Sequence, residues 1–434
     1  MKIIATPRQN GIANIAGRSF NLLVRLQATP EDCEGREVIP LNVALVVDRS
    51  GSMSGGKLEE AKRCVASLIE RLTDRDRVAL VDYDDAINTS LALMPALAAQ
   101  QIAPIALASL SPGGTTALHG GWLRGAELLA AGADRKSVSR VVLLSDGQAN
   151  HGLQRSEDIC PQVAALAAAG VTTTTVGIGN GFNEELMVAM ATAGQGGAHY
   201  GERLEDLAEA FEAELGMLKA LAFRDVRLTI QGEAGQAFKV ANGYVKQEEG
   251  FQLPSIACGS EAWALLKMPM REAVRLAQAG QSIRLRVSAL DAKGNPIAID
   301  HEIAFPPVVT PQEFRELPKD DLVSRRRTEI QAADIQIAAR LAARNGSWDR
   351  VEEAIAELKS LGEENEWIKA SVPFLERLMQ ARDEEAFSKE SYHKAYFMRS
   401  RVSALDESAH FSASVEESEA EFLRRKMAQG RRST

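Results

Sequence analysis

The sequence predicts an α/β protein in which a doubly wound, Rossmann-like unit is inserted in an antiparallel β-sandwich, with an α-helical region towards the C-terminal end. Three observations predict this class. From residue 41 to about 215, short apolar runs alternate with helical periodicity, which is typical of a parallel sheet covered on both faces. Residues 18–28 and 223–307 show the alternation of antiparallel strands. From Thr310 onward the apolar spacing is helical.

The length of 434 residues suggests two to three domains. Two isolated N-terminal strand segments cannot form a sheet alone, so we expect them to pair with strands of the later β region. The predicted organisation is N-terminal strands in 1–39, the α/β domain in 40–216, the β-sandwich region in 217–309, the helical region in 310–405, and a polar tail in 406–434 that we expect to be disordered.

Within the α/β domain, strands and helices follow one another in a regular order. The predicted strands are Leu41–Val47, Val78–Val81, Val141–Ser145, Val171–Ile178 and a short edge strand at His199-Tyr200. The predicted helices are Leu58–Leu72, the helix that the Pro-Gly-Gly-Thr-Thr turn at 112–116 opens, Ile159–Ala169, Glu184–Ala193 and Leu204 to about Leu221.

The flanking regions differ in pattern. Glycines at 232, 235, 243 and 250 and the lack of a convincing helical period make 223–307 an antiparallel β region. Further on, Leu322–Leu341 and Trp348–Leu361 keep helical spacing on either side of Asn345-Gly346-Ser347, which predicts a helical hairpin, and Glu366 to about Leu405 adds more helix. Arg325-Arg326-Arg327 reads as a solvated helix face.

Composition argues against several classes of function. The net charge is -9, and basic residues are not gathered into one run except near the end, so we expect no nucleic-acid partner. No run approaches the roughly 18 apolar residues that cross a bilayer, and residues 1–7 lack a signal-peptide pattern, so we expect a cytoplasmic protein with no membrane association. The four cysteines, Cys33, Cys64, Cys160 and Cys258, show no C-x-x-C spacing and are interpreted as buried free thiols rather than metal ligands or disulfides.

Oxygen-bearing side chains lie where two predicted strands end. Asp48, Ser50 and Ser52 follow the first strand of the α/β domain, and Asp146 follows the strand 141–145. The Gly113-Gly114-Thr115-Thr116 turn precedes a helix of the same domain. Ligand sites of open parallel sheets lie outside the carboxyl ends of the strands, and hard divalent cations prefer oxygen ligands. A helix N-cap would explain the Asp48 loop alone, but the three pieces together predict a metal site.

This set of motifs resembles a von Willebrand factor A domain with an intact metal-ion-dependent adhesion site, whose pattern is D-x-S-x-S, a distant Thr and a distant Asp. Similarity extends to Asp76–Leu80 and Val176–Gly179 and covers about residues 40–215. The resemblance implies a bound Mg²⁺, with Mn²⁺ or Ca²⁺ as alternatives. It implies that Ser50, Ser52 and one of Thr115 or Thr116 are direct ligands, while Asp48 and Asp146 act through water.

The choice between the two threonines stays open at this point. Thr116 is favoured because the pattern that follows it places Trp122 where the next helix should bury a large apolar residue. Thr115 is the alternative because many relatives read G-G-T at this turn.

The chemistry that the resemblance implies is binding rather than catalysis. A cation with few direct carboxylate ligands stays electrophilic and can accept an Asp or Glu carboxylate from a protein partner. His119 and His151 are the only imidazoles in reach, and both read as exposed polar residues rather than catalytic bases. Arg49 either faces the partner or lies at the rim. Neither the phosphate-loop pattern nor the G-x-S-x-G nucleophile elbow is present near residue 50.

We therefore expect a non-enzymatic, Mg²⁺-dependent protein-interaction module with a scaffold or adaptor role. The alternative is a subunit of a chelatase-like remodelling or metal-insertion complex that works with an AAA-type ATPase. A third hypothesis is a purely structural protein in which the metal only ties the loops together.

Overall fold

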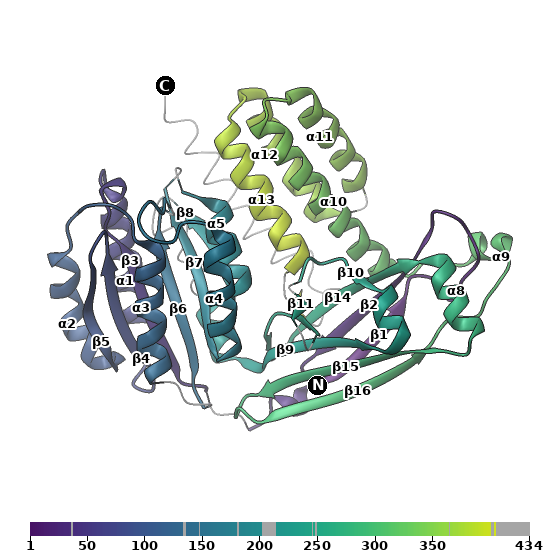
Figure 1. Cartoon of the computed structure of the whole chain (residues 1–434), viewed down its shortest axis with the longest axis horizontal. Helices are drawn as coiled ribbons and strands as arrows, with labels where there is room; N and C mark the ends of the chain where they lie inside the picture. Colours follow the sequence, from purple (N-terminus) through teal and green to yellow (C-terminus); the bar gives the residue numbers. More distant parts are fainter. Residues whose placement is uncertain are drawn as a thin grey trace.

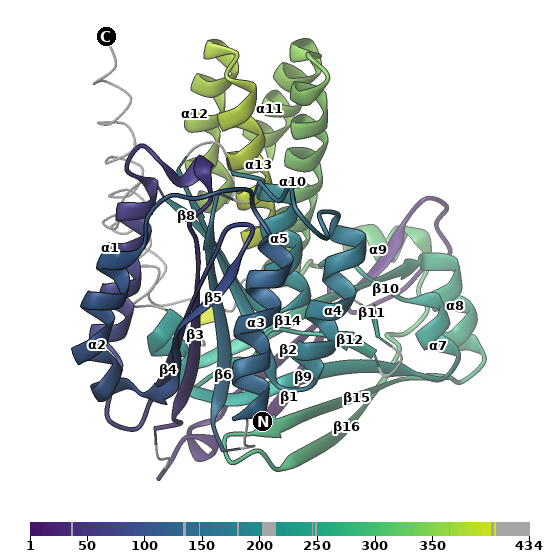
Figure 2. The ribbon, with the colours of Figure 1, turned by 60° about the vertical axis from the view of Figure 1, so that its left-hand side comes forward.

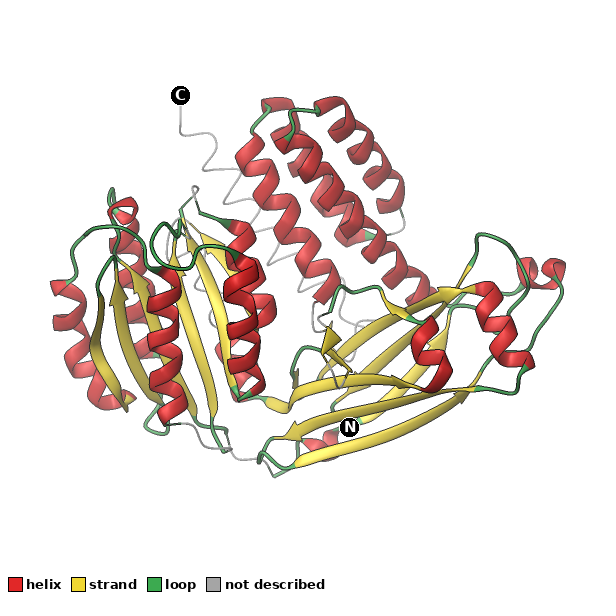
Figure 3. Ribbon diagram, viewed as in Figure 1, coloured by secondary structure: helices red, strands yellow, loops and turns green. Residues whose placement is uncertain are grey.

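The computed structural model describes residues 1–35, 38–132, 136–146, 148–179, 182–201, 214–244, 246–247, 250–363, 365–400 and 403–404. Figure 1 shows an α/β domain on one side, a β-sandwich on the other and a helical bundle above them. Figure 3 shows that helices cover the α/β sheet, whereas strands dominate the sandwich. The predicted fold class is confirmed. The predicted tail at 406–434 and most of the predicted helix at 204–221 lie outside the described residues.

The α/β sheet has the strand order β5-β4-β3-β6-β7-β8, and all neighbours are parallel except β5, which is antiparallel to β4. Its strands are β3 (Leu41–Asp48), β4 (Arg77–Tyr83), β5 (Ile87–Pro95), β6 (Val138–Ser145), β7 (Val171–Ile178) and β8 (Gln195–Gly201). Its helices are α1 (Lys57–Glu70), α2 (Ala96–Ser109), α3 (Leu118–Ala131), α4 (Ser156–Ala168) and α5 (Glu184–Ala193).

The sheet is covered on both faces, since β3 and β6, which are mostly apolar, are buried at every position. Leu45 of β3 packs with α1 and α2 on one face, and Val46 packs with α3, α4 and α5 on the other. Figure 2 shows the sheet between these two helical layers. Trp122 of α3 is fully buried, and its indole N–H donates to Thr173 Oγ1 of β7 at 3.0 Å. This bond satisfies the one polar group of the largest side chain in the core.

The sandwich consists of two antiparallel sheets. One has the order β1 (Lys2–Pro7), β2 (Ser19–Gln27), β14 (Ser260–Pro269), β10 (Lys239–Val240), with β17 (Ser403–Ala404) paired to β14. The other has the order β11 (Lys246–Gln247), β12 (Gly250–Gln252), β9 (Leu221–Gln231), β15 (Ser282–Asp291), β16 (Pro296–Ala304), with β13 (Ile256–Ala257) paired to β9. The register of β2 on β14 runs from Gln27 opposite Glu261 to Ser19 opposite Pro269, so the predicted pairing of the N-terminal strands is confirmed.

Two predictions about this region are wrong. It contains two helices, α7 (Gly232–Ala237) and α8 (Met270–Gln278). In α8 the buried residues include Met270, Ala273 and Val274, whose spacing is helical, but nine residues between strands are too few to stand out as a period. The prediction that all four cysteines are free thiols also fails.

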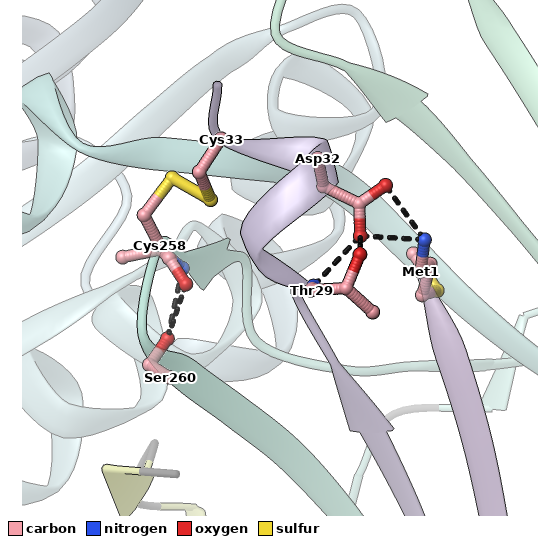
Figure 4. Close-up of a disulfide and its surroundings, with 7 residues drawn as sticks. Met1, Thr29, Asp32, Cys33, Cys258 and Ser260 are labelled. Carbon is pink, nitrogen blue, oxygen red and sulfur yellow. Dashed lines mark hydrogen bonds and ion pairs between the residues drawn. A yellow bond between two sulfur atoms is a disulfide. The ribbon is translucent and has the colours of Figure 1, made fainter.

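Cys33 and Cys258 form a disulfide, with their Cα atoms 6.0 Å apart (Figure 4). The pairing of β2 with β14 explains it, because Cys33 lies shortly after β2 and Cys258 shortly before β14. Asp32 stiffens the same turn by accepting hydrogen bonds from the backbone N–H and hydroxyl of Thr29 at 2.7 and 2.9 Å. Cys64 and Cys160 form no disulfide; Cys64 is buried, as predicted, whereas Cys160 is only half-buried.

The helical region contains α9 (Pro311–Glu316), α10 (Asp321–Arg344), α11 (Trp348–Gly362), α12 (Glu366–Ala381) and α13 (Glu384–Ser400). The predicted hairpin is confirmed by α10 and α11, which are separated at Asn345-Gly346-Ser347. No helix among the described residues is long and apolar enough to cross a bilayer.

Helix α10 contacts both of the other parts of the molecule. Arg326 lies 4.7 Å from the centre of the Trp263 ring of β14 and pairs with Glu329 at 3.0 Å, with both charged side chains 1% exposed. The prediction that Arg325-Arg326-Arg327 is a solvated face is therefore wrong for Arg326. Further along, Arg340 pairs with Glu184 of α5 at 3.0 Å. These contacts tie the bundle to the sandwich at one end and to the α/β domain at the other.

Candidate metal centre

Three segments meet at the carboxyl edge of the α/β sheet. Asp48 ends β3, Asp146 directly follows β6, and the turn that contains Thr116 precedes α3. Asp48 and Asp146 are completely buried, and Thr116 is 1% exposed. Parallel strands place their carboxyl ends on one side of a sheet, which is why residues nearly 100 positions apart in sequence come together here.

Hydrogen bonds from Ser50 and Ser145 fix the carboxylate of Asp48. Its Oδ1 accepts from the backbone N–H of Ser50 at 2.8 Å, and its Oδ2 accepts from Ser145 Oγ at 2.6 Å. Ser50 is 1% exposed, and its hydroxyl lies 3.1 Å from the hydroxyl of Ser52, which is half-buried. Burial raises the pKa of Asp48, and the negative charge of Asp146 also raises it, whereas hydrogen bonds from Ser145 and Ser50 lower it. Additional positive charge at this point would stabilise the ionised form.

The threonine turn is bonded to the Asp48 loop through backbone groups. The N–H of Gly51 donates to the carbonyl of Gly114 at 3.0 Å, and the N–H of Gly113 donates to the carbonyl of Arg49 at 2.7 Å. A Cβ on Gly113 would lie 2.0 Å from Asp84 Oδ2. The turn can lie this close to the ion pair of Arg49 and Asp84 because residue 113 is a glycine.

The structure distinguishes the two candidate threonines by burial. The N–H of Thr116 donates to Asn150 Oδ1 at 2.7 Å, and its carbonyl accepts from the N–H groups of Asn150 and His151, both at 3.2 Å. Thr116 is thus fastened to the segment that follows β6, whereas Thr115 is exposed. A buried and immobilised side chain is the better candidate for a fixed ligand.

Arg49 has a role that the sequence analysis missed. Its guanidinium pairs with Asp82 at 2.8 Å and with Asp84 at 2.7 Å, and the side chain is only 17% exposed. Arg49 therefore joins the Asp48 loop to the end of β4 and is not directed at a partner. The signal in the sequence was the acidic run that starts at Asp82, immediately after the predicted strand 78–81.

Lys57 was also missed. Its Nζ lies 3.2 Å from Asp146 Oδ2, and its side chain is 29% exposed, so it supplies a positive charge to a buried carboxylate. The backbone of Asp146 is engaged as well, since its carbonyl accepts from the N–H of Asn183 at 3.1 Å. Asn183 also caps α5 by accepting from Leu186 N at 3.1 Å.

The two nearby imidazoles differ in exposure and contacts. His119 Nε2 lies 3.1 Å from Gln162 Oε1 of α4, so the residue is half-buried and engaged there rather than exposed as predicted. His151 is exposed, as predicted.

The donors at this edge are of one kind: hydroxyl and carboxylate oxygens from Asp48, Ser50, Ser52, Thr116 and Asp146. Among the described residues there is no cluster of three or more His, Cys, Asp or Glu side chains arranged to hold a metal. An oxygen set with two carboxylates and several hydroxyls fits a small, hard cation better than a soft one.

Comparisons with known proteins agree with this architecture. The family model for the von Willebrand factor type A domain matches residues 42–213. A curated relative, "Uncharacterized protein sll0103" of Synechocystis sp., is 28% identical over 224 residues, which are 51% of this chain and 52% of the relative. This chain thus spans about half the length of that relative.

Two solved structures are similar over nearly the whole chain. The ArnB paralog VWA2 from Sulfolobus acidocaldarius has a TM-score of 0.60 at 17% identity and covers 92% of this chain and 98% of its own. A von Willebrand factor type A protein from Catenulispora acidiphila has a TM-score of 0.64 at 18% identity, over 85% of this chain and 88% of its own. At these identities the likeness shows a shared fold. The chain therefore contains a von Willebrand factor type A domain, which spans residues 42–213.

Proposed function

We propose that the carboxyl edge of the α/β sheet binds Mg²⁺ through the hydroxyls of Ser50, Ser52 and Thr116. In this proposal Asp48 and Asp146 act through water. The observation that carries it is the burial of both carboxylates together with the hydrogen bonds that fix Asp48 from within the chain. These bonds occupy one site on each oxygen of Asp48, which supports a role for this carboxylate in orienting water and hydroxyls around the ion.

The bound ion would supply electrophilicity towards a further oxygen ligand. Hydroxyl ligands leave most of the charge of a divalent cation uncompensated, so an Asp or Glu carboxylate of a protein partner is the ligand it would favour. The side of the site that faces solvent is formed by exposed residues, among them Gly51, Gly114 and Thr115. A partner side chain can therefore approach from this side while the buried carboxylates stay inside.

The function that follows is a non-enzymatic, metal-dependent protein-interaction module with a scaffold or adaptor role. Acid–base or nucleophilic catalysis would need a group within hydrogen-bond reach of the ion. His119 is engaged with α4, and the cation of Lys57 is paired with Asp146, so these two side chains favour binding over catalysis.

A metal-dependent pull-down tests the proposal. Wild-type protein, Asp48→Ala and a matched control, Asp74→Ala at an exposed position, are used as bait in Mg²⁺ and in EDTA. We expect wild type and the control to retain a partner only in Mg²⁺, and Asp48→Ala to lose it in both buffers. Calorimetric titration with Mg²⁺ checks that the variant has lost the ion. Equal recovery in EDTA and with Asp48→Ala would sink the proposal.

A further inference from the structure

A second candidate site lies at the end of the sandwich away from the α/β domain. A cavity of about 220 Å³ opens between the loop that joins β1 to β2, the start of α8 and the segment from α9 to α10. Figure 1 shows α8 and α9 at this remote end. Nothing in the proposed metal centre involves it, so it would serve a separate function.

The charges that line this cavity are all positive. Arg8, Arg18, Arg315 and Lys319 contribute to the lining, and none of the described residues that line it is an aspartate or glutamate. Within the described part of the chain, Arg18, Arg315 and Lys319 pair with no carboxylate. Other surface cations do have such a partner nearby, as Arg275 does with Glu272 at 2.9 Å. The cavity therefore collects positive charge that the protein leaves uncompensated.

Arg8 is the least exposed of the four cations, and its pKa responds to the positive charge around it. Its Nε donates to Ser324 Oγ at 3.2 Å, which fixes the guanidinium without neutralising it. Burial lowers the pKa of Arg8, and the positive charges of Arg327 and Arg18 lower it further. Like charges held this close repel one another unless an anion is placed between them.

The cations are carried on backbone that the fold holds in place. Gln9 Nε2 donates to the carbonyls of Phe314 and Leu317 at 2.9 and 3.1 Å, which fastens the segment that carries Arg315 and Lys319 to the β1–β2 loop. The N–H of Asp320 donates to the carbonyl of Arg8 at 2.8 Å. On the other wall, the N–H of Met270 donates to the carbonyl of Arg18 at 3.0 Å. A site whose walls are bonded to each other loses little freedom when a ligand binds.

We propose that this cavity binds the phosphate group of a small ligand. Guanidinium groups match the geometry of phosphate oxygens through paired N–H donors, and a lysine adds a point charge. A phosphate group carries a charge near −2 and several strong acceptor oxygens, which suits four cations better than a single carboxylate does. The cavity is smaller than the roughly 300–1,000 Å³ of pockets that enclose drug-sized ligands, so it fits a phosphate with at most a short organic part.

Calorimetric titration of the full chain in EDTA tests this proposal with two probes, inorganic phosphate and glycerol 3-phosphate, against sodium chloride at equal ionic strength. The test variant combines Arg315→Gln and Lys319→Gln, two exposed side chains whose loss should leave folding intact. The control is Arg350→Gln on the exposed side of α11. We expect wild type to bind phosphate. The double variant should bind it at least tenfold more weakly, and Arg350→Gln should bind it like wild type.

Two results would overturn the proposal. One is a heat of binding no greater than that of chloride at the same ionic strength. The other is an equal loss with Arg350→Gln, which would mean that only the overall charge matters. Tighter binding of glycerol 3-phosphate supports a phosphate ester as the ligand, and equal or tighter binding of inorganic phosphate supports the free ion. Asp48→Ala should bind both probes like wild type, so this test is independent of the metal centre.

Discussion

Lys57→Met is the substitution that most directly tests how the candidate metal centre balances its charge. The ammonium of Lys57 lies 3.2 Å from the fully buried Asp146, an attraction of about 5 kcal/mol at an effective dielectric constant of about 20. Desolvation and the 29% exposure of Lys57 reduce the net value. Exposed pairs contribute about 0–1 kcal/mol, whereas removing one partner of a buried pair costs about 3–5 kcal/mol. We therefore expect Lys57→Met to lower the free energy of unfolding by about 2–3 kcal/mol.

The assay is thermal unfolding of wild type and variant in EDTA and in saturating Mg²⁺. In EDTA the variant should melt about 4–12 °C lower, since 1 kcal/mol shifts the melting temperature of a domain of this size by about 2–4 °C. In Mg²⁺ the gap should narrow, because the ion replaces the missing positive charge. Calorimetry should show at least tenfold tighter Mg²⁺ binding by the variant. The control is Lys62→Met in the same helix, whose pairing with the exposed Glu59 should be worth less than about 1 kcal/mol.

The reasoning would be refuted by equal destabilisation of Lys57→Met in EDTA and in Mg²⁺, or by unchanged Mg²⁺ affinity. Either result would mean that Lys57 stabilises the loops by packing alone and does not compete with a metal cation for the carboxylate of Asp146.

Three further predictions concern the threonines, acid stability and the disulfide. Thr116→Ala should weaken Mg²⁺ binding at least tenfold in calorimetry, while Thr115→Ala at the exposed position should bind within about twofold of wild type. Burial raises the pKa of Glu214, but the hydrogen bond and charge of His199, together with Arg140, bring it down to about 2 from 4.5. The ionised form of Glu214 thus contributes about 3 kcal/mol to the free energy of unfolding above pH 4.5, and this contribution is lost as the pH falls from 4.5 to 2. In acid unfolding, the stability of Glu214→Gln should therefore fall less over this pH range than that of wild type. Reduction of the disulfide should lower the free energy of unfolding by about 2–5 kcal/mol in denaturant melts. Thiol trapping in intact cells would test the expected cytoplasmic location, because disulfides persist mainly in oxidising compartments.

The sequence was sufficient to predict the central part of the fold. In β3 and β6 every residue is buried, so their apolar runs stand out against the amphipathic helices between them. The edge of the sheet was less visible. Strand β5 is mostly exposed and antiparallel, and the Ala-rich α2 that follows it lacks a strong polar face, so neither was predicted. An element is visible in the sequence where it forms a continuous apolar run or has one face that differs from the other, and β5 and α2 have neither feature.

The candidate site was predictable as a set of residue types but not as a network of contacts. Asp48, Ser50 and Ser52 share one loop, and Asp146 follows the neighbouring strand, so topology alone brings them together. The ion pairs of Arg49 and Lys57 could not be inferred, because a charged side chain in a loop has many partners within reach. The disulfide was missed for a similar reason, since its cysteines are 225 residues apart.

The insertion of the α/β domain in the sandwich has a consequence for the order in which the protein is made. Strand β2 is synthesised well before its partner β14, because Glu261 of β14, which pairs with Gln27, lies 234 positions later in the chain. At about 5–20 residues per second, β2 waits roughly 12–47 s for its partner. The α/β domain is complete by then, so β1 and β2 remain an isolated apolar hairpin with an unpaired edge while it folds. This interval is when nascent chains are most exposed to aggregation and to chaperones, and it ends only when β14 arrives and brings Cys258 beside Cys33.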